Sequence, residues 1–580
     1  MMRKSDWQSR EKKRLEDYLK LYNSGDWQKV VTEGNILISM GLQNDVLSET
    51  IGKAYFNLGD FTLAKKYLAK MTETNSAQKA EKYWLMGTAD NQLKNYMGAC
   101  QNFNIARQAL SSLECIKDIG KAAKNRELWA QPGFKANILA QHAVNEMLCG
   151  DIEAAVRDYK DASDNAITLR DKCECYSSYL MTMHNRQKYE QDVYAAACQY
   201  NEIFSAVSSY KHDGKQRRRK LRIGYISPDF RRHVMFYFYY ALFLAYSRDD
   251  FEVYAYYLGR RKDKFTALVQ KQADKWIPLG ECNYAESAAR IYADEIDILV
   301  DLGGHSVNGA LPVLAYKPAP IQISGLGYMG TTGLQAVDYL ITDKVCDPPE
   351  APRKITEKPL YIPSLFCYIG RSDVPLSRGT PALTKGYVTF GVFNRYNKIS
   401  AEMLGGWQKI QAAVVDSCFY FKSAAYADPL LAQKIREQLR QAGFVMDRVI
   451  LEPADDDYME KYLSVDIALD TYPYTGGGTT CDALYMGVPV ITLTGRSRSS
   501  KFSASILTAA GLTELVAHDM DEYVRLAVAM ASNMAVLQDL HIALRGMLQN
   551  SLLMDVEHYV QAVECEYHRL WDEYEKKAGK

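Results

Sequence analysis

VDIALDTYPYTGGGTTCDALYMGVPVITLT, residues 465–494, is the stretch on which the fold prediction depends. An apolar, strand-like run at 466–469 leads into a turn-rich loop at 472–478, a helix start at Thr479–Thr480 and a second strand-like run at 488–493. Strand, loop, helix and strand in this order are typical of a parallel α/β sheet. We therefore expect a doubly wound sheet around this stretch.

The glycine loop within this stretch predicts an anion site. Glycine lets backbone N–H groups approach a ligand closely, and a helix N-terminus adds unpaired donors and the positive end of its dipole. The candidate binding residues are Gly476, Gly477, Gly478, Thr479 and Thr480, which would cradle a diphosphate, and Asp482, which would bind ribose hydroxyls. The alternative is a tight turn capped by Thr479 without any ligand. The loop is neither a Walker loop nor a dinucleotide fingerprint, because it has no Gly-Lys-Ser/Thr and no G-x-G-x-x-G.

Bulk composition excludes several classes of protein. The chain has 580 residues, enough for roughly three or four domains. Its 70 Lys and Arg balance 70 Asp and Glu, so we do not expect a nucleic-acid binder. Its 12 cysteines include no C-x-x-C pair, which predicts reduced thiols, a cytoplasmic location and no metal site. The charged N-terminus predicts no signal peptide, and no stretch reaches the ~20 apolar residues of a membrane span.

Residues 1–205 are expected to be helical, because apolar residues recur at helical spacing and Gly and Pro are few. A turn pattern recurs at about one tetratricopeptide period, in Gly25-Asp26-Trp27, Gly59-Asp60-Phe61 and Lys94-Asn95-Tyr96, and resumes within 146–162. Helix pairs of this kind stack into a solenoid with a concave surface, although residues 115–134 break the register. We expect its groove to hold a protein partner. The alternative is a spacer or a dimerising scaffold, which leaves a homo-oligomer open.

Beyond a basic linker at 206–220, alternating strand-like and helical segments predict two doubly wound lobes. We place the lobes at 221–380 and 381–550, and a long amphipathic helix within 551–580. The strands predicted for the first lobe are 221–230, 251–259, 296–305, 320–328 and 337–343, and those for the second are 387–393, 417–423, 448–453, 466–470 and 489–494. Because ligands bind at the carboxyl ends of such strands, we expect a binding cleft between the lobes.

Five motifs then carry a family resemblance. In chain order they are LRIGYISPDFRRH (221–233), DILVDLGGHS (297–306), YKPAPIQISGLGYMGTTGLQAVDYLITD (316–343), FGVFNRYNKIS (390–400) and LDTYPYTGGGTTCDALYMGVPV (469–490). Together they resemble the O-linked N-acetylglucosamine transferase and Spindly family, and the organisation looks like that of its shorter bacterial members. The resemblance covers almost the whole chain. It implies an α-helical tetratricopeptide-like solenoid followed by an α/β glycosyltransferase B fold with two Rossmann-like lobes.

The resemblance also implies an activity. The family transfers a sugar from a nucleotide sugar to a protein hydroxyl, with inversion and without a metal or other cofactor. We therefore expect UDP-N-acetylglucosamine as the donor and Ser or Thr of a protein as the acceptor, with flagellin as one candidate client. Three alternatives stay open: an O-fucosyltransferase that uses GDP-fucose, an enzyme that glucosylates Asn, and a non-catalytic scaffold that binds a nucleotide sugar.

A metal-free enzyme of this kind must neutralise its leaving diphosphate with N–H donors and a cation. Lys398 matches the family's essential lysine, and Asn394 and Arg395 lie on the same turn, where Arg395 is a candidate pyrophosphate contact. The alternative for Lys398 is an ordinary surface lysine before a helix capped by Ser400. His233 matches the family histidine at the mouth of the cleft, once proposed as the general base.

Other candidates are less specific. Asp301 and His305 follow another strand of the first lobe and are second candidates for acceptor or base roles, and the glycine loop 327–332 is expected to face the same cleft. Tyr458 is a candidate nucleotide contact. The departures from the family pattern are Met329 for a proline, Tyr458 for a histidine near the base, Lys461 for an arginine, the acidic loop 454–457, and Ser500–Lys501–Phe502–Ser503 for Ser-Arg-Val-Gly. Because most of these departures fall in the second lobe, they affect the prediction of the donor's nucleotide base and sugar more than the prediction of the fold.

Overall fold

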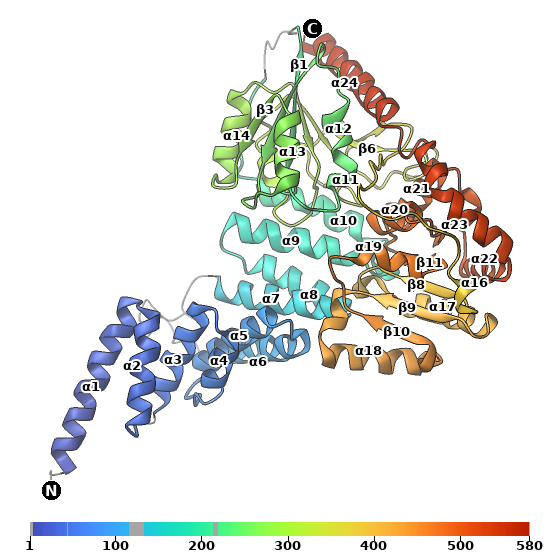
Figure 1. Ribbon diagram of the computed structural model, residues 1–580. Coiled ribbons are helices and arrows are strands. Elements are labelled where there is room, and N and C mark those ends of the chain that lie inside the picture. Colours follow the sequence, from blue (N-terminus) through green and yellow to red (C-terminus); the bar gives the residue numbers. More distant parts are fainter. Residues whose placement is uncertain (1–3, 43, 115–132, 213–218, 579–580) are drawn as a thin grey trace. The chain divides into compact units, whose positions relative to one another are not determined.

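A computed structural model describes residues 4–42, 44–114, 133–212 and 219–578 (Figure 1). The chain divides into two compact units, residues 1–172 with 428–431, and residues 173–427 with 432–580. Residues 115–132 of the predicted break of register and residues 213–218 of the predicted basic linker fall outside the described residues.

The first unit is helical, as the sequence predicts. Its helices are α1 (Lys4–Ser24), α2 (Trp27–Ser39), α3 (Asp45–Leu58), α4 (Phe61–Leu68), α5 (Ser76–Gln92), α6 (Tyr96–Glu114), α7 (Phe134–Leu148) and α8 (Ile152–Asp164). Alanine and large apolar side chains interlock between them; one buried cluster joins Ala80, Ala106 and Ile138 from α5, α6 and α7. Such stacking buries apolar faces that no single helix pair could cover.

The recurring turn pattern has a physical basis in this unit. Gly25, Gly59 and Gly150 have φ of +79°, +81° and +86°, and Lys94 takes φ of +58° at the equivalent place. The side chain that follows each of them accepts a backbone N–H three residues on and so caps the second helix of the pair. These caps are Asp26, Asp60, Asn95 and Asp151. A left-handed residue and a polar cap thus set each turn.

The boundary between the units lies earlier than predicted, at Lys172/Cys173 rather than near 205. Helices α9 (Leu169–Met183), η3 (Gln187–Tyr189), α10 (Asp192–Gln199) and η4 (Tyr200–Phe204) lie across and beyond it. Their side chains are bonded to the first lobe: His184 Nε2 lies 3.1 Å from Tyr328 Oη, and the Tyr200 ring packs edge-on against His305. These four helices, called the junction helices, therefore belong to the second unit in packing, although their sequence continues the helical pattern of the first.

The first lobe contains a seven-stranded parallel sheet in the order β3-β2-β1-β4-β5-β6-β7. Its strands are β1 (Leu221–Ser227), β2 (Phe251–Tyr257), β3 (Lys275–Pro278), β4 (Ile298–Asp301), β5 (Ile321–Ser324), β6 (Tyr339–Thr342) and β7 (Lys358–Tyr361). Its helices are α11 (Phe236–Tyr239), α12 (Ala241–Leu244), α13 (Lys264–Gln272), α14 (Tyr284–Ala293) and α15 (Leu311–Leu314). The five predicted strands are present. Strands β3 and β7 were not predicted, because both are short edge strands that contain proline and exposed lysine.

The second lobe contains a six-stranded parallel sheet in the order β10-β9-β8-β11-β12-β13. Its strands are β8 (Thr389–Val392), β9 (Cys418–Lys422), β10 (Val449–Glu452), β11 (Ile467–Leu469), β12 (Val490–Leu493) and β13 (Val516–Ala517). Its helices are α16 (Ala382–Lys385), α17 (Ala401–Ala413), α18 (Pro429–Gln441), α19 (Tyr458–Lys461), α20 (Gly478–Tyr485), α21 (Phe502–Ala509), α22 (Met520–Ser532) and α23 (Met534–Gln549), with the 3₁₀ turn η5 at Tyr396–Lys398. The opening stretch of the sequence analysis therefore forms β11, α20 and β12, as predicted.

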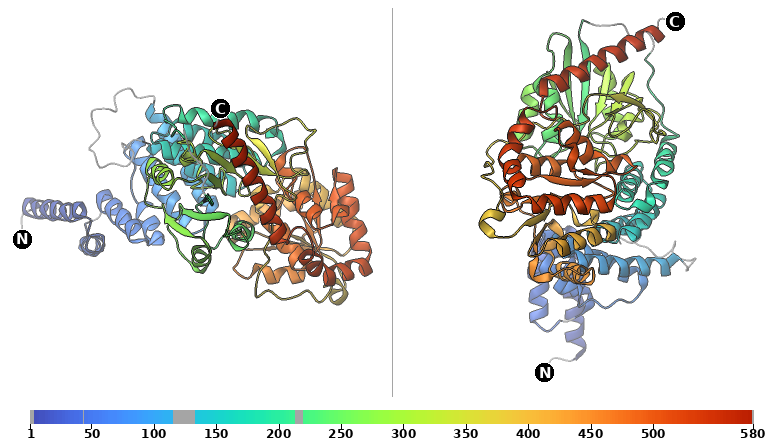
Figure 2. Two further views of the ribbon diagram at one scale, coloured as in Figure 1. Left: turned by 90° about the horizontal axis from the view of Figure 1, so that it is seen from above. Right: turned by 90° about the vertical axis from the view of Figure 1, so that its right-hand side faces the viewer.

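The last helix, α24 (Val556–Ala578), packs on the first lobe (Figures 1 and 2). Tyr567 Oη lies 3.3 Å from Tyr225 Oη of β1, and Glu564 accepts a hydrogen bond of 2.7 Å from the backbone N–H of Ser247. Trp571 is completely buried. Helix α24 thus completes the core of the first lobe, although it lies more than 190 residues beyond that lobe's last strand in sequence.

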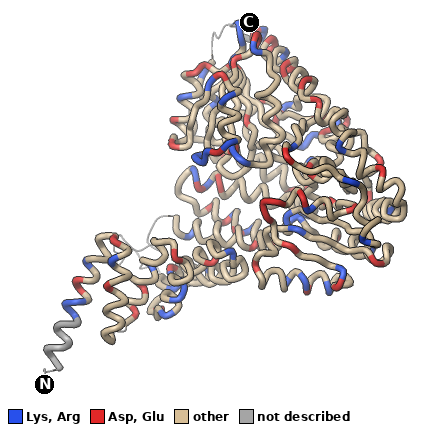
Figure 3. Tube along the Cα trace, in the orientation of Figure 1, with Lys and Arg blue, Asp and Glu red and all other residues tan. Residues whose placement is uncertain are grey.

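Lys and Arg are interleaved with Asp and Glu along the second unit in the view of Figure 3, in line with the equal numbers of the two kinds. In the part of the chain that the structure describes, no single helix is long and apolar enough to cross a membrane. The pair α22 and α23, bent by 93°, meets that test jointly by length and composition alone.

Both sheets reverse their strand order at one place. Strand β1 pairs with β2 on one side and β4 on the other, and β8 likewise lies between β9 and β11. Ligands of open parallel sheets bind beyond the carboxyl ends of the strands at such points. The loops that follow β1, β4, β8 and β11 therefore position the candidate site.

Candidate functional site

Asp470, directly after β11, folds the glycine loop from inside. Its side chain is buried, and Oδ1 accepts hydrogen bonds from the N–H groups of Thr471 and Gly476, both at 2.8 Å, and from Asn394 Nδ2 at 3.1 Å. Its Oδ2 accepts a bond of 2.8 Å from Thr492 Oγ1 on β12. One carboxylate thus ties together loops that follow β8 and β11.

The three glycines of this loop have different surroundings. A Cβ on Gly476 would lie 2.3 Å from Thr480 Oγ1, and a Cβ on Gly478 would lie 2.2 Å from Val234 Cγ2 of the first lobe. A Cβ on Gly477 would meet nothing within 4 Å. Gly476 and Gly478 are therefore required by packing. Gly477 instead borders open space, so its lack of a side chain keeps that space free.

Helix α20 begins without a side-chain cap. Its N-cap residue is Gly477, and the N-cap makes no side-chain hydrogen bond to the first turn. Thr479, which the sequence offered as a cap, instead donates from Oγ1 to Asn394 Oδ1 at 3.2 Å. Thr480 Oγ1 lies 2.8 Å from Ser503 Oγ. The capped tight turn is therefore not what forms, and the N–H groups at the start of α20 keep the unpaired donors and positive dipole end of an anion site.

Two cationic side chains stand at this helix start. Lys398, on η5, donates from Nζ to Thr475 O at 3.0 Å, and Nζ lies 3.5 Å from the centre of the Tyr474 ring. Burial, reinforced by the charge of Arg395, lowers the pKa of Lys398 to about 7, although Asp470 opposes that change. Arg395 is exposed beside it. Lys398 is therefore a partly buried amine that contacts the glycine loop and carries its charge below about pH 7, unlike an ordinary surface lysine.

His233 reaches the same place from the first lobe. It lies in the loop after β1, next to Val234, which meets Gly478. Its Nδ1 lies 3.5 Å from Asp229 Oδ2 and accepts a hydrogen bond of 3.4 Å from the N–H of Met235. Burial lowers the pKa of His233, and the charge of Arg395 acts in the same direction. The ring is therefore neutral at physiological pH. Because Nδ1 accepts from Met235, the proton lies on Nε2 and the lone pair that could take up a proton is on Nδ1.

Asp482 does not have the role that the sequence predicted. Its Oδ1 accepts hydrogen bonds from Tyr368 Oη at 2.8 Å and Arg371 Nε at 2.9 Å. Its Oδ2 accepts from Arg371 Nη2 at 2.9 Å and Tyr458 Oη at 2.6 Å. With both oxygens occupied and the side chain buried, Asp482 is not free to bind ribose hydroxyls.

Arg371 is a functional candidate that the sequence did not reveal. Its guanidinium lies 4.0 Å from the centre of the Tyr237 ring in the first lobe while it pairs with Asp482 in the second. Asp482 raises the pKa of Arg371 against the effect of burial, so the guanidinium stays charged. Arg371 lies in an irregular segment between the lobes that contains no motif, and only the spatial arrangement identifies it as a link between them.

Asp301 builds a loop rather than facing the cleft. It ends β4 and is completely buried. Its Oδ1 accepts from the N–H of Gly303 at 3.0 Å, and its Oδ2 accepts from the N–H of Gly304 at 2.8 Å and from Ser324 Oγ at 2.7 Å. Burial raises the pKa of this carboxyl group, but its bonds are all internal. The predicted acceptor or base role of Asp301 is therefore not supported by its position.

His305 is likewise enclosed. Its Nδ1 lies 2.9 Å from Ser177 Oγ of α9, and its Nε2 lies 2.8 Å from Thr332 O. Both ring nitrogens are used, and burial lowers the pKa of His305 to about 4. A ring with no open nitrogen cannot act as a base on an acceptor, so the structure leaves His233 as the histidine at the cleft.

One group of described side chains has the composition of a metal site, in the first unit: His142, Glu146 and Asp158. His142 Nδ1 lies 2.6 Å from Asp158 Oδ2, and Arg107 Nη1 lies 2.8 Å from Asp158 Oδ1. Although burial opposes it, the bond to Asp158 raises the pKa of His142 to about 9, and burial raises the pKa of Glu146 to about 8. His142 and Asp158 thus have partners within the protein, whereas Glu146 Oε2 is buried without one.

Comparisons with known proteins agree with this geometry. The sequence model of the family described as Glycosyl transferase family 41 matches residues 178–377 and 369–563. SPINDLY of Arabidopsis thaliana, described as a probable UDP-N-acetylglucosamine–peptide N-acetylglucosaminyltransferase, is 36% identical over 368 residues, which are 62% of this chain and 40% of the relative. SPINDLY of Oryza sativa is 36% identical over 364 residues, 61% of this chain and 39% of the relative.

This chain therefore spans only about 40% of the length of these curated relatives. A solved structure of a mutant O-GlcNAc transferase from Thermobaculum terrenum is similar over much more of it. The two chains superpose with a TM-score of 0.78 at 25% identity, over 93% of this chain and 100% of the other.

Proposed function

Because the chain belongs to glycosyl transferase family 41, we propose that it is a protein glycosyltransferase whose nucleotide sugar binds at the start of α20. The resemblance read from the five motifs is confirmed, and so is the fold of a helical region followed by two parallel-sheet lobes. The proposed donor is UDP-N-acetylglucosamine. The proposed acceptor is a Ser or Thr hydroxyl of a protein, held by the helical repeats of the first unit.

The observation that carries this proposal is the uncapped start of α20 beside Lys398. Open space borders Gly477, the N–H groups of the first turn have no side-chain cap, and Lys398 and Arg395 add positive charge at the same point. A diphosphate needs such fixed donors and a point charge when it leaves with its electron pair. These residues can neutralise that charge themselves, so the proposal includes catalysis without a metal.

The proposed reaction is a single displacement. The acceptor oxygen attacks C1 of the sugar from the face opposite the diphosphate, the bond from C1 to the diphosphate oxygen breaks, and the configuration at C1 inverts. The hydroxyl proton is taken up by a base at the cleft. For neutral His233 to be that base, its Nδ1 would exchange the weak 3.4 Å bond from Met235 for the acceptor hydroxyl. The diphosphate leaves with the bonding electron pair into the field of Lys398, Arg395 and the α20 N-terminus.

Asp482 and Arg371 act indirectly in this proposal. They lie behind the glycine loop and connect the two lobes through Tyr368 and Tyr237. A donor that spans the cleft needs the lobes at a fixed distance, and positional errors of about 1 Å can reduce catalysis by about a hundredfold. We therefore treat both as positioning residues.

Within this proposal, the donor nucleotide sugar is the component for which other candidates remain. The names of the curated relatives favour UDP-N-acetylglucosamine. Tyr458 and Lys461 differ from the residues of the resembled pattern, and Lys461 Nζ is held 3.0 Å from Glu452 Oε1. GDP-fucose as donor, or Asn as acceptor, is therefore the competing version within the same enzyme class. A non-catalytic scaffold that binds a nucleotide sugar would use the same cation for the diphosphate, so turnover is the property that separates it from the enzyme.

The deciding experiment measures release of the nucleoside diphosphate from UDP-N-acetylglucosamine, UDP-glucose and GDP-fucose, with EDTA present. We expect turnover with UDP-N-acetylglucosamine, addition of its sugar to Ser or Thr by mass spectrometry, and loss of turnover in Lys398→Met. Lys409→Met, a surface lysine of the same lobe paired with Asp521, is the matched control. Binding of a donor without any turnover would favour the scaffold, and a requirement for a divalent metal would overturn the mechanism.

A further inference from the structure

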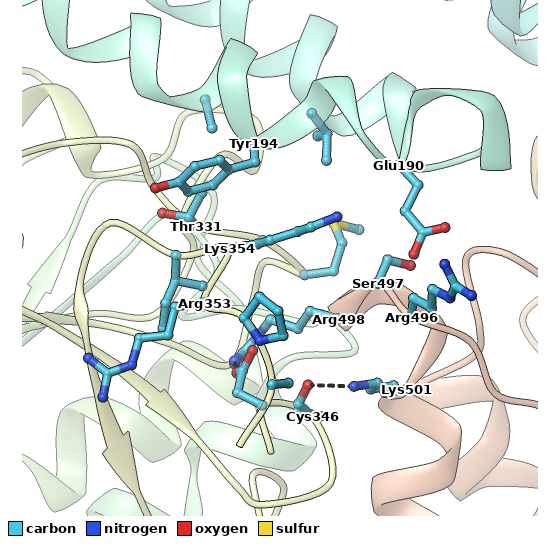
Figure 4. A pocket seen from close by; sticks show the side chains of 18 of the residues that line it. Glu190, Tyr194, Thr331, Cys346, Arg353, Lys354, Arg496, Ser497, Arg498 and Lys501 are labelled. Carbon is cyan, nitrogen blue, oxygen red and sulfur yellow. Dashed lines mark hydrogen bonds and ion pairs between the residues drawn. The ribbon is translucent and has the colours of Figure 1, made fainter. Parts of the chain in front are cut away.

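A separate cavity of about 460 Å³ lies within the second unit (Figure 4). Its walls come from three places: residues 190–197 of the junction helices, the first-lobe segments 328–331 and 346–355, and the second-lobe segment 495–501. Lys398, His233 and glycines 476–478 are not among its lining residues. Its size is that of a small-molecule site, and it requires both lobes to be complete.

The cavity adjoins the back of the loop that carries the donor cradle. Gly495 lines it, and a Cβ there would lie 2.7 Å from the Tyr472 ring, two residues before Tyr474, on which Lys398 rests. On the first-lobe side, Tyr328 and Met329 from the glycine loop 327–332 also line it. That loop, expected to face the donor cleft, thus contributes to this second cavity.

The charged lining is mainly basic. Arg353, Lys354, Arg496, Arg498 and Lys501 line the cavity, against the two carboxylates Glu190 and Asp347. In Figure 4, Lys354 extends across the cavity whereas the Arg353 guanidinium points away. Lys501 is half-buried, and its Nζ has a long contact of 3.5 Å to Cys346 O. An ammonium with one weak partner in a partly dry cavity favours an anionic ligand.

Arg498 supplies a second, independent sign of a missing ligand. Nη1 donates to Thr342 Oγ1 at 2.8 Å and pairs with Asp347, and Nη2 donates to Ile341 O at 2.8 Å. Only 9% of the residue is exposed, and its Nε is buried and has no hydrogen-bond partner. Glu190 Oε1 is also buried and without a partner, but a carboxylate oxygen opposes an anion, so only the donor Nε counts toward one. Unsatisfied buried polar atoms are rare in native structures and mark places where a ligand or water belongs.

The rest of the lining is apolar. It includes Val193, Met329, Pro348, Pro352, Ile355 and Pro359. Apolar walls with a few convergent polar groups bind a small molecule with an apolar body and a polar head. We propose that this cavity binds a small organic anion, a carboxylate or a phosphate on an apolar or aromatic body. The ligand is neither the sugar donor nor the protein acceptor, so this inference goes beyond the proposed function.

Calorimetric titration with phenyl phosphate, 3-phenylpropanoate and the neutral 3-phenylpropanol tests the proposal. We expect saturable binding of at least one anion and none of the alcohol. Lys501→Gln is expected to weaken that binding by about tenfold or more, because a charge-assisted partner is lost. Lys409→Gln, the surface control, and Lys398→Met should bind the anion like the wild type. The tighter of the two anions identifies the head group.

The proposal is overturned if the alcohol binds as tightly as the anions, if no probe binds, or if Lys398→Met weakens binding while Lys501→Gln does not. The last result would place the probe in the donor cradle. Should Lys501→Gln melt at a lower temperature than the wild type, the exposed Arg496→Gln replaces it in the same comparison. None of these titrations needs donor turnover, so failure of the proposed activity and failure of this site are distinguishable.

Discussion

The loops after β4 and β11 share one anchor but differ in what surrounds them. Each begins at a buried aspartate, Asp301 or Asp470, whose carboxylate accepts the N–H of a glycine further along the loop. Each carboxylate also accepts a hydroxyl from the neighbouring strand, Ser324 on β5 or Thr492 on β12. The same device therefore folds a glycine loop at the switch point of each lobe.

The surroundings then make one loop closed and the other open. Gly304, after β4, has φ of +56°, and a Cβ there would lie 2.4 Å from Tyr328 Cβ. Gly477, after β11, borders empty space, with Lys398 close to the same loop. An aspartate followed by glycines at a strand end thus indicates that the carboxylate anchors the loop. Whether it can bind an anion depends on what packs against it.

The largest effect is expected from Lys398→Met, which removes the cation from the open loop. Loss of a group that stabilises developing charge lowers turnover by about 10²–10³-fold. The melting temperature should stay the same or rise, because a half-buried ammonium is replaced by an apolar side chain of similar length. Diphosphate release and thermal melts check both expectations. A parallel fall in stability and activity would mean that Lys398 is structural.

A matched pair of alanine substitutions compares the closed loop after β4 with the open loop after β11. Gly304→Ala should destabilise the protein by about 2–4 kcal/mol, because the left-handed backbone and the clash with Tyr328 both oppose a Cβ. Gly477→Ala should change stability by less than about 0.5 kcal/mol. We expect Gly477→Ala instead to weaken UDP binding about tenfold, since its methyl group occupies the space in front of α20.

Melting temperatures and UDP titrations read out this pair. Gly405→Ala is the control, because a Cβ at that exposed position of α17 meets nothing within 4 Å. It should stabilise the protein by up to about 1 kcal/mol through helix propensity and leave UDP binding unchanged. Equal binding of UDP by Gly477→Ala and the wild type would show that the open space is not the cradle.

Substituting the two anchors should separate a shared structural role from a binding role. Asp301→Asn and Asp470→Asn each replace a carboxylate oxygen with an NH₂ group that faces donors, at a cost of about 1–3 kcal/mol in stability. Only Asp470→Asn should also weaken UDP binding, because its loop forms the proposed diphosphate cradle. Thermal melts and calorimetry measure the two effects. A similar loss of UDP affinity in both variants would contradict the distinction between the loops.

The remaining effect concerns pH. The pKa of Lys398 is lowered to about 7 in the free protein, so its ammonium form is present below pH 7 and is lost as the pH rises. Bound diphosphate favours the ammonium, so UDP affinity should fall between pH 7 and 8.5, by at most about tenfold per pH unit. Calorimetry in buffers of different ionisation enthalpy should show proton uptake on binding. Lys398→Met should remove both the slope and the uptake.

The sequence was sufficient for the architecture because its signals are local. The Gly-Asp turns of the repeats and the apolar runs of the central strands depend on a few adjacent residues, and the structure contains them where the pattern indicates. The short edge strands β3 and β7 have no such pattern, since exposure on an edge relaxes the requirement for apolar residues. The junction helices continue the helical pattern without a break, so packing alone assigns them to the second unit.

The site was predictable only in part. The motifs indicated Lys398, His233 and the glycine loop, because strand ends and glycines carry a local signal. They also indicated Asp482 as a ribose contact, whereas Arg371, more than a hundred residues earlier in the chain, occupies its carboxylate. Asp301 and His305 have the chemistry of a base but are saturated by internal bonds. The sequence shows which polar groups are present, whereas only the fold shows which of them already have hydrogen-bond partners.

Helix α24 has a consequence for biosynthesis. Residues 556–578 emerge from the ribosome after both sheets, yet Tyr567 packs against Tyr225 of β1 and Phe251 of β2 in the lobe that was translated earlier. A nascent chain that has reached residue 550 therefore holds a first lobe whose Tyr225 and Phe251 still face water or a chaperone. The packing of Tyr225 and Phe251 is therefore complete only after this helix has been translated.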